Sequence, residues 1–139
     1  LNSPWNLFHK RYNNSEISRK EIGSYVSNET KARFYQLYGD SHKLDPEVLK
    51  KKFGYFNLVF IDGDHSRDGV RQDTELAKQI IAYDGIICWH DANPKEKYKD
   101  TRLYLEEIAL KAIATMDNYI GGIACWSQEI EQRLLSLDR

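Results

Sequence analysis

The fold is decided by the stretch Phe56-Asn57-Leu58-Val59-Phe60-Ile61-Asp62-Gly63-Asp64-His65-Ser66. It begins as an almost unbroken apolar run, which is typical of a strand buried on both faces of a sheet, and it ends abruptly in two carboxylates and an imidazole. Open α/β sheets hold their ligands beyond the carboxyl ends of their strands. The polar end of this strand is therefore the first place where we expect a site.

The same pattern returns further along the chain in Ile86-Ile87-Cys88-Trp89-His90-Asp91. Between the two runs, residues 70–81 have the apolar spacing of a helix. Two parallel strands joined by a crossover helix end at the same edge of their sheet. This arrangement would place five polar side chains along one rim, namely Asp62, Asp64, His65, His90 and Asp91.

Strands and helices alternate through the rest of the chain from residue 33 onward. We expect a strand over residues 33–38, followed by a helix that begins at Asp45-Pro46, runs to about Phe53 and is ended by Gly54. A tight turn is expected at Asp84-Gly85, a loop over 93–99, and a helix from residue 100 or 101 to about 113. A β segment over 119–126 and a helix over 128–137, capped by Ser127, complete the expected elements. Gly121-Gly122 indicates a bulge or a close approach of two backbones. The order predicts an α/β fold, a Rossmann-like doubly wound and mainly parallel sheet with helices on both faces.

The beginning of the chain is less regular. Residues 1–15 mix aromatic residues with turn formers, and residues 16–28 have helix-like spacing that Gly23 weakens. No convincing strand precedes residue 30. By its length of 139 residues, the chain is expected to form a single domain.

Charge and hydropathy exclude several classes of partner. Twenty basic and 21 acidic side chains leave a net charge of -1, so no global charge attracts nucleic acid or an anionic membrane. No apolar run approaches the ~20 residues that a membrane span needs, and no signal-peptide pattern is present. We therefore expect a cytoplasmic protein with no nucleic-acid or membrane partner, and the sequence leaves oligomer formation open.

The two cysteines, Cys88 and Cys125, both occur in apolar, strand-like surroundings. Neither has a partner at the spacing of a metal site, so we expect buried thiols in a reducing compartment. A disulfide between them stays open as an alternative.

Three segments carry a resemblance to a known family: Asp40-Ser41, the 56–66 stretch, and Gly85 with the Ile86–Asp91 run that follows it. Together they resemble the later part of a class I S-adenosylmethionine-dependent methyltransferase. The closest likeness is to small methyltransferase domains whose fourth strand ends in D-G-D-H-S and whose fifth ends in H-D. The resemblance covers roughly residues 30–126, and the double motif is more specific than either half.

The resemblance implies cofactor contacts at matching positions. Asp40 and Ser41 match the contacts on the adenine side of S-adenosylmethionine, and Asp62 with Gly63 matches the methionine end. From the residues alone, Asp40 and Ser41 are equally typical of an ordinary turn.

The resemblance also implies a metal site and a base. In the cation-dependent relatives the position of Asp62 ligates a divalent metal together with the pair that ends the next strand, here His90 and Asp91. Strands lie ~4.8 Å apart, so their ends can share one ion. The geometry allows a divalent metal here, manganese, iron, zinc or magnesium, but does not require one, and His65 or His90 is the candidate catalytic base. Asp64 could instead be a turn residue that accepts from amides in the 66–69 segment, and His65 a structural hydrogen bonder.

The chain departs from the family pattern where the cofactor is chiefly held. No Gly-rich turn and no acidic strand end of the kind that binds the ribose is found ahead of residue 40. We therefore expect the carboxyl-terminal portion of a longer methyltransferase, whose sheet lacks its first two strands. We also expect these residues alone to bind the cofactor weakly.

The function expected from these features is transfer of a methyl group from S-adenosylmethionine to an oxygen or nitrogen of a small molecule, with a sugar-related substrate as one candidate. Two alternatives use the same residues differently. One is a metal-dependent hydrolase built on Asp62, His90 and Asp91. The other is a non-catalytic α/β fragment.

Overall fold

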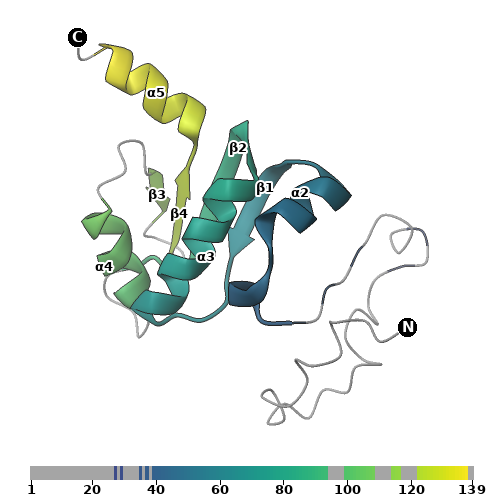
Figure 1. Ribbon diagram of the computed structural model, residues 1–139. Coiled ribbons are helices and arrows are strands. Elements are labelled where there is room, and N and C mark those ends of the chain that lie inside the picture. Colours follow the sequence, from purple (N-terminus) through teal and green to yellow (C-terminus); the bar gives the residue numbers. More distant parts are fainter. Residues whose placement is uncertain are drawn as a thin grey trace, which may run out of the picture. The chain divides into compact units, whose positions relative to one another are not determined.

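The computed structural model describes residues 27, 29, 35, 37, 39–93, 99–108, 114–116 and 122–137 (Figure 1). The chain divides into two compact units, residues 1–43 and 44–139. The only regular element described over more than one residue in the first unit is the short 3-10 helix η2 (Ser41–Lys43).

The second unit contains the sheet and its helices. In chain order the described elements are α2 (Pro46–Phe53), β1 (Phe56–Ile61), α3 (Arg67–Ile80), β2 (Ile81–His90), α4 (Lys99–Glu107), β3 (Ala114–Met116), β4 (Ile123–Trp126) and α5 (Gln128–Leu137). None of the described helices is both long and apolar enough to cross a membrane.

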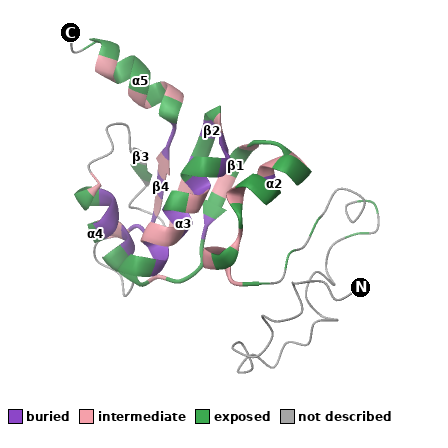
Figure 2. Cartoon of the chain, in the orientation of Figure 1, coloured by how far each residue is buried: buried purple, intermediate pink, exposed green. Residues whose placement is uncertain are grey.

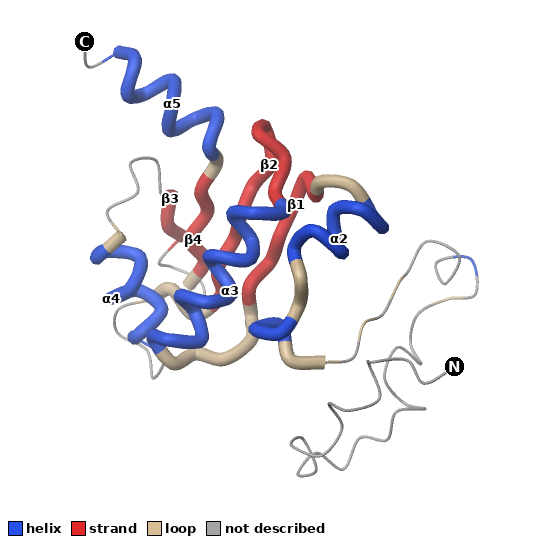
Figure 3. Tube along the Cα trace, viewed as in Figure 1, coloured by secondary structure: helices blue, strands red, loops and turns tan. Residues whose placement is uncertain are grey.

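The four described strands form one sheet in the order β1-β2-β4-β3 (Figure 3). β1 and β2 pair in parallel, with Val59 opposite Ile87 and Ile61 opposite Trp89. β4 runs antiparallel to both of its neighbours, so β3 points the same way as β1 and β2. This mixed α/β sheet, with its parallel β1–β2 pair, confirms the predicted Rossmann-like fold class, although both described pairings of β4 are antiparallel.

The core lies between one face of the sheet and the helices α3 and α4. Ile87 and Trp89 of β2 have no exposed surface, and Ala77 of α3 and Leu105 of α4 pack in the same cluster. Along β2, the buried residues Ile87 and Trp89 alternate with the partly or fully exposed residues Ile86, Cys88 and His90. Figure 2 shows that α3 and α4 each carry buried residues together with exposed ones. The helix over 70–81 and the two apolar strands therefore meet as the sequence predicted.

The opposite face of the sheet is open over β1 and β2. Leu58 and Phe60 of β1 and Ile86 of β2 keep 60%, 52% and 42% of their surface exposed. The prediction that β1 is buried on both faces is therefore wrong for the described part of the chain. Its apolar run packs on one side only, because α3 and α4 share a face.

The ends of α2 follow directly from the local sequence. Asp45 caps the helix, accepting from the amide of Glu47 at 2.8 Å, and Pro46 fills the first helical position. Gly54 follows the last residue at φ 77°, a conformation that glycine adopts without the penalty of a Cβ. Both predicted helix ends are confirmed, as is the final helix over 128–137.

Two other predictions need correction, and one strand was not predicted. The Asp84-Gly85 pair does not form a turn ahead of the strand, because β2 already begins at Ile81. Ile81 pairs with Phe56 and Ile86 pairs with Leu58, so residues 82–85 form an irregular bulge within the ladder. α3 begins at Arg67, before the expected residue 70, and the short β3 was not predicted.

The remaining expected elements lie partly or wholly outside the described residues. These are the helix over 16–28, most of the loop over 93–99, the end of the helix expected to reach residue 113 and the first part of the 119–126 segment. Of the strand expected over 33–38, only Tyr35 and Leu37 are described, and neither lies in a strand.

Candidate functional site

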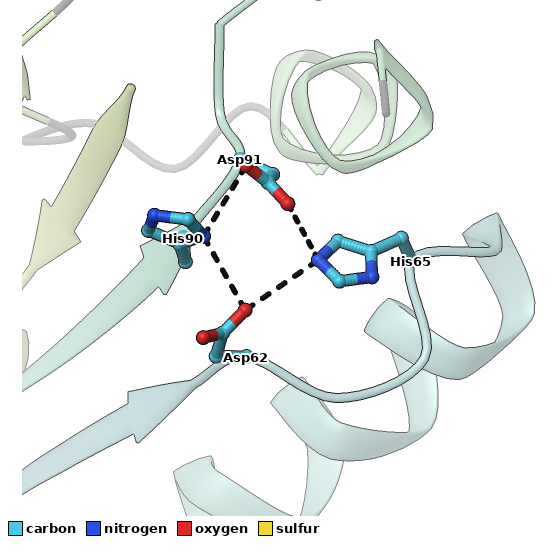
Figure 4. A group of neighbouring side chains, drawn as sticks. All are labelled: Asp62, His65, His90 and Asp91. Carbon is cyan, nitrogen blue, oxygen red and sulfur yellow. Dashed lines mark ion pairs between the residues drawn. The ribbon is translucent and has the colours of Figure 1, made fainter. Parts of the chain in front are cut away.

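The carboxyl ends of β1 and β2 bring four polar side chains together. Asp62 directly follows β1, His90 is the last residue of β2, and Asp91 comes next. His65 reaches the same point from the loop between β1 and α3 (Figure 4). These are four of the five residues that the sequence predicted along one rim.

The four side chains form a closed ring of alternating acid and imidazole groups, which we call the Asp-His ring (Figure 4). His65 Nε2 lies 2.6 Å from Asp91 Oδ2 and 3.5 Å from Asp62 Oδ1. His90 Nδ1 lies 3.3 Å from Asp62 Oδ1 and 3.2 Å from Asp91 Oδ1. One ligand atom from each residue lies within 4.8 Å of all the others.

The ring is partly shielded from water. The side chain of Asp91 is only 12% exposed, and those of His65 and His90 are 25% and 33% exposed, whereas Asp62 is open at 47%. With both imidazoles neutral, the ring carries two negative charges. Such a group is stabilised by a bound cation.

The geometry of His90 favours a shared cation. Within the described part of the chain, its buried Nδ1 makes no hydrogen bond, although two carboxylate oxygens lie within 3.3 Å. In a tetrahedral zinc site each bond measures about 2.0–2.2 Å, so the ligand atoms are roughly 3.4 Å apart. The distances of 3.2–3.5 Å in the ring fit a common ion, whereas the 2.6 Å between His65 Nε2 and Asp91 Oδ2 would have to increase.

The donor set narrows the choice of metal. Two imidazole nitrogens with two carboxylate oxygens suit manganese, iron or zinc, whereas magnesium prefers a shell of oxygens. His65 was expected as a base and not as a ligand, and its ring position now makes it a candidate for both. The clue in the sequence was the presence of two imidazoles at adjacent strand ends.

Asp91 is held in an unusual backbone conformation. Its φ of 54° lies in the left-handed region, which aspartate tolerates better than most residues but still at a cost. The next residue, Ala92, donates its amide to the carbonyl of Gly122 at 3.4 Å. A Cβ on Gly122 would lie 2.7 Å from the nitrogen of Asn93, so the close backbone approach predicted here is confirmed.

Asp64 lies outside the Asp-His ring and orders the turn into α3. Its Oδ1 accepts from the amide of Ser66 at 2.9 Å, and its Oδ2 accepts from the Ser66 hydroxyl at 3.0 Å. Ser66 in turn caps α3 by accepting from the amide of Gly69 at 3.1 Å. The interpretation of Asp64 as a turn residue is confirmed, and this turn carries His65 toward the ring.

A buried hydrogen-bond network stands behind the site. Thr74 of α3 donates to the carbonyl of Val70 at 2.7 Å and accepts from the Trp89 indole at 2.8 Å. Burial raises the pKa of Tyr104, and a hydrogen bond with Thr74 partly offsets that rise. This network fixes Trp89 one residue before His90 and so positions the end of β2.

Asp40 and Ser41, the two residues expected to contact the adenine side of the cofactor, lie in the first unit, whereas the Asp-His ring lies in the second. They are therefore described by themselves. Burial acts to raise the pKa of Asp40, but hydrogen bonds from Lys43 and from the His42 amide outweigh it and lower that pKa. Asp40 Oδ1 accepts from the His42 amide at 3.1 Å, which makes it the turn former that the residues alone allowed. Ser41 begins η2.

Gly63 lies in the exposed turn after Asp62 and contributes no side chain to the ring. A Cβ at this position would lie 3.0 Å from Asp73 Oδ2, so there is little room for a larger residue. Its expected contact with the cofactor remains a prediction.

Comparison with known proteins found one family. A family model described as a methyltransferase domain matches residues 5–92, from the beginning of the chain to the loop after β2. The match includes the whole Asp-His ring and begins earlier than the resemblance noted from the motifs. Neither curated proteins nor solved structures gave a match.

Proposed function

Because the chain belongs to this family of methyltransferase domains, we propose that it serves the transfer of a methyl group from S-adenosylmethionine to an oxygen or nitrogen of a small molecule, with a divalent cation in the Asp-His ring. The observation that carries the proposal is the convergence of Asp62, His65, His90 and Asp91 within 4.8 Å at the ends of β1 and β2. This edge of a parallel sheet is where α/β folds bind their ligands.

Asp62 and Gly63 form the cofactor side of the proposed site, next to the methionine end, with Asp40 and Ser41 as the proposed adenine contacts. The cofactor, when bound, supplies a methyl group already activated by its sulfonium, so the protein has to align the two reactants and exclude water. Asp62 is the most exposed member of the ring, which leaves its carboxylate accessible to a ligand.

His65 is the proposed base. Its Nε2 lies 2.6 Å from the nearly buried carboxylate of Asp91, which orients the ring and stabilises an imidazolium once a proton has been taken from the acceptor. In a site without a cation, His90 is the second candidate, because it too lies between two carboxylates. A base is needed only if the acceptor loses its proton as the methyl group arrives.

The cation is proposed to be held by Asp62, His90 and Asp91, which leaves His65 to act as the base, with manganese, iron or zinc preferred over magnesium. When bound, it supplies Lewis acidity that orients the acceptor and lowers the pKa of its hydroxyl. A small polar molecule with a hydroxyl near a second oxygen fits this role, and a sugar derivative belongs to that class.

The proposal is tested by titrating the 139-residue chain with manganese by calorimetry, and then with S-adenosylhomocysteine while backbone amide shifts are followed by NMR. We expect one manganese per chain. Asp62→Asn should weaken manganese binding by tenfold or more, while Asp68→Asn, an exposed acid in α3 outside the ring, leaves it unchanged. S-adenosylhomocysteine should shift the amides of Asp62 and Gly63, even if the affinity is only millimolar.

The outcomes separate the alternatives. Manganese binding with no response to saturating S-adenosylhomocysteine would favour the metal-dependent hydrolase. A response to S-adenosylhomocysteine without manganese binding would remove the cation and leave the methyltransferase. Neither response would favour a non-catalytic fragment.

A further inference from the structure

Cys88 and Cys125 face each other across two strands. Cys88 lies in β2 and Cys125 in β4, and they are directly opposite in the antiparallel register. Their sulfur atoms are 2.9 Å apart, and both residues are half-buried free thiols. The expectation of buried thiols is therefore wrong, because both residues are partly exposed.

The strand geometry suits a covalent link. Opposite residues of an antiparallel pair have Cα atoms about 4.5–5.5 Å apart, which lies within the range of about 4.4–6.8 Å that disulfides span. Only about 0.9 Å of further approach is needed to reach a sulfur–sulfur bond of about 2.04 Å.

We propose that Cys88 and Cys125 form a reversible disulfide when the chain meets an oxidising thiol pool. In the balanced reaction, one cysteine attacks a small-molecule disulfide and releases one thiol. The second cysteine then attacks the mixed disulfide and releases the other thiol. Two S–H bonds and the sulfur–sulfur bond of the oxidant are exchanged for the protein disulfide and two small thiols.

The position of the pair gives this link a structural consequence. His90 follows two residues after Cys88 on the same strand, and its own opposite residue in β4 is Ile123. A bond two register positions before His90 would pin β4 to β2 close to the Asp-His ring. It would also close a loop between positions 37 residues apart, which restricts the unfolded chain.

The test uses oxidised glutathione on the whole 139-residue chain. After exposure, the chain is denatured, treated with iodoacetamide and weighed by mass spectrometry. We expect a monomer that has lost two hydrogen masses and takes up no iodoacetamide, because the chain has only these two cysteines. Dithiothreitol should restore two alkylation sites.

A stability measurement supports the same inference. Oxidation should lower the equilibrium constant for unfolding by roughly a hundredfold in urea, and dithiothreitol should reverse the shift. The Cys88→Ser and Cys125→Ser chains should show no such shift. Persistent mixed disulfides with glutathione, covalent dimers, or two free thiols after exposure would each overturn the proposal, and these readouts need no variant to fold.

Discussion

Two buried threonines that differ in hydrogen bonding allow a sharp test of the network behind the site. Thr74 and Thr101 are exposed by only 1% and 2%. The Thr74 hydroxyl donates to the Val70 carbonyl and accepts from the Trp89 indole, whereas the Thr101 hydroxyl has no hydrogen-bond partner in the part of the chain that the structure describes. The same change, threonine to valine, should therefore destabilise the chain at position 74 but not at position 101.

The magnitude at position 74 follows from the loss of an acceptor. Valine has nearly the shape of threonine, so packing is kept while Trp89, with no exposed surface, is left with an unsatisfied buried donor. That costs about 1–3 kcal/mol. Thr74→Val should lower the free energy of unfolding by this amount. Thr101→Val removes a buried hydroxyl without breaking a hydrogen bond, so it should leave stability unchanged or raise it by about 1 kcal/mol.

Urea denaturation followed by tryptophan fluorescence measures both variants. A difference of about 2 kcal/mol between them corresponds to roughly 1 M in the urea midpoint, for a slope of about 2 kcal/mol/M. The slopes themselves should match the unsubstituted chain. Equal losses of unfolding free energy in the two variants would refute the reasoning, because they would show that the hydrogen bonds of the Thr74 hydroxyl do not contribute to stability.

Three further predictions concern the site and its supports. Gly122→Ala should lower the free energy of unfolding by about 2–5 kcal/mol, measured by heat or urea, and weaken manganese binding, because the added Cβ would meet Asn93 beside the ring. Gly54→Ala is the control: Gly54 also has a positive φ but has open space around it, so manganese binding should be unchanged. Ser66→Ala should cost about 1 kcal/mol through the lost helix cap, and Ser66→Asn should restore most of it; a fully stable alanine variant would contradict the capping role. Manganese at a hundred times its dissociation constant should stabilise the chain by about 2.7 kcal/mol, and Asp62→Asn should abolish most of that gain; an equal gain in both chains would place the metal elsewhere.

Much of the fold could be read from local signals because those signals act over a few residues. The Asp45-Pro46 start and Gly54 end of α2 depend on backbone conformation alone and were predicted correctly. The start of α3 was missed by three residues, although Ser66 is a favourable cap, because the apolar spacing begins only at Val70. The bulge after Ile81 was mistaken for a turn because aspartate followed by glycine suits both.

The sequence by itself determined that carboxylates and imidazoles end two apolar strands, since strand period and topology place such ends at one edge of a sheet. Only the tertiary structure decided which of them meet. In the turn at Ser66, Asp64 accepts from the backbone while His65 reaches the ring. Asp91 has a left-handed φ, and the next residue, Ala92, is hydrogen-bonded to Gly122. The pairing of Cys88 with Cys125 likewise depended on the register of β4, which joins residues 37 positions apart. Side-chain contacts across such separations arise from packing and ladder register, which no short stretch of sequence encodes.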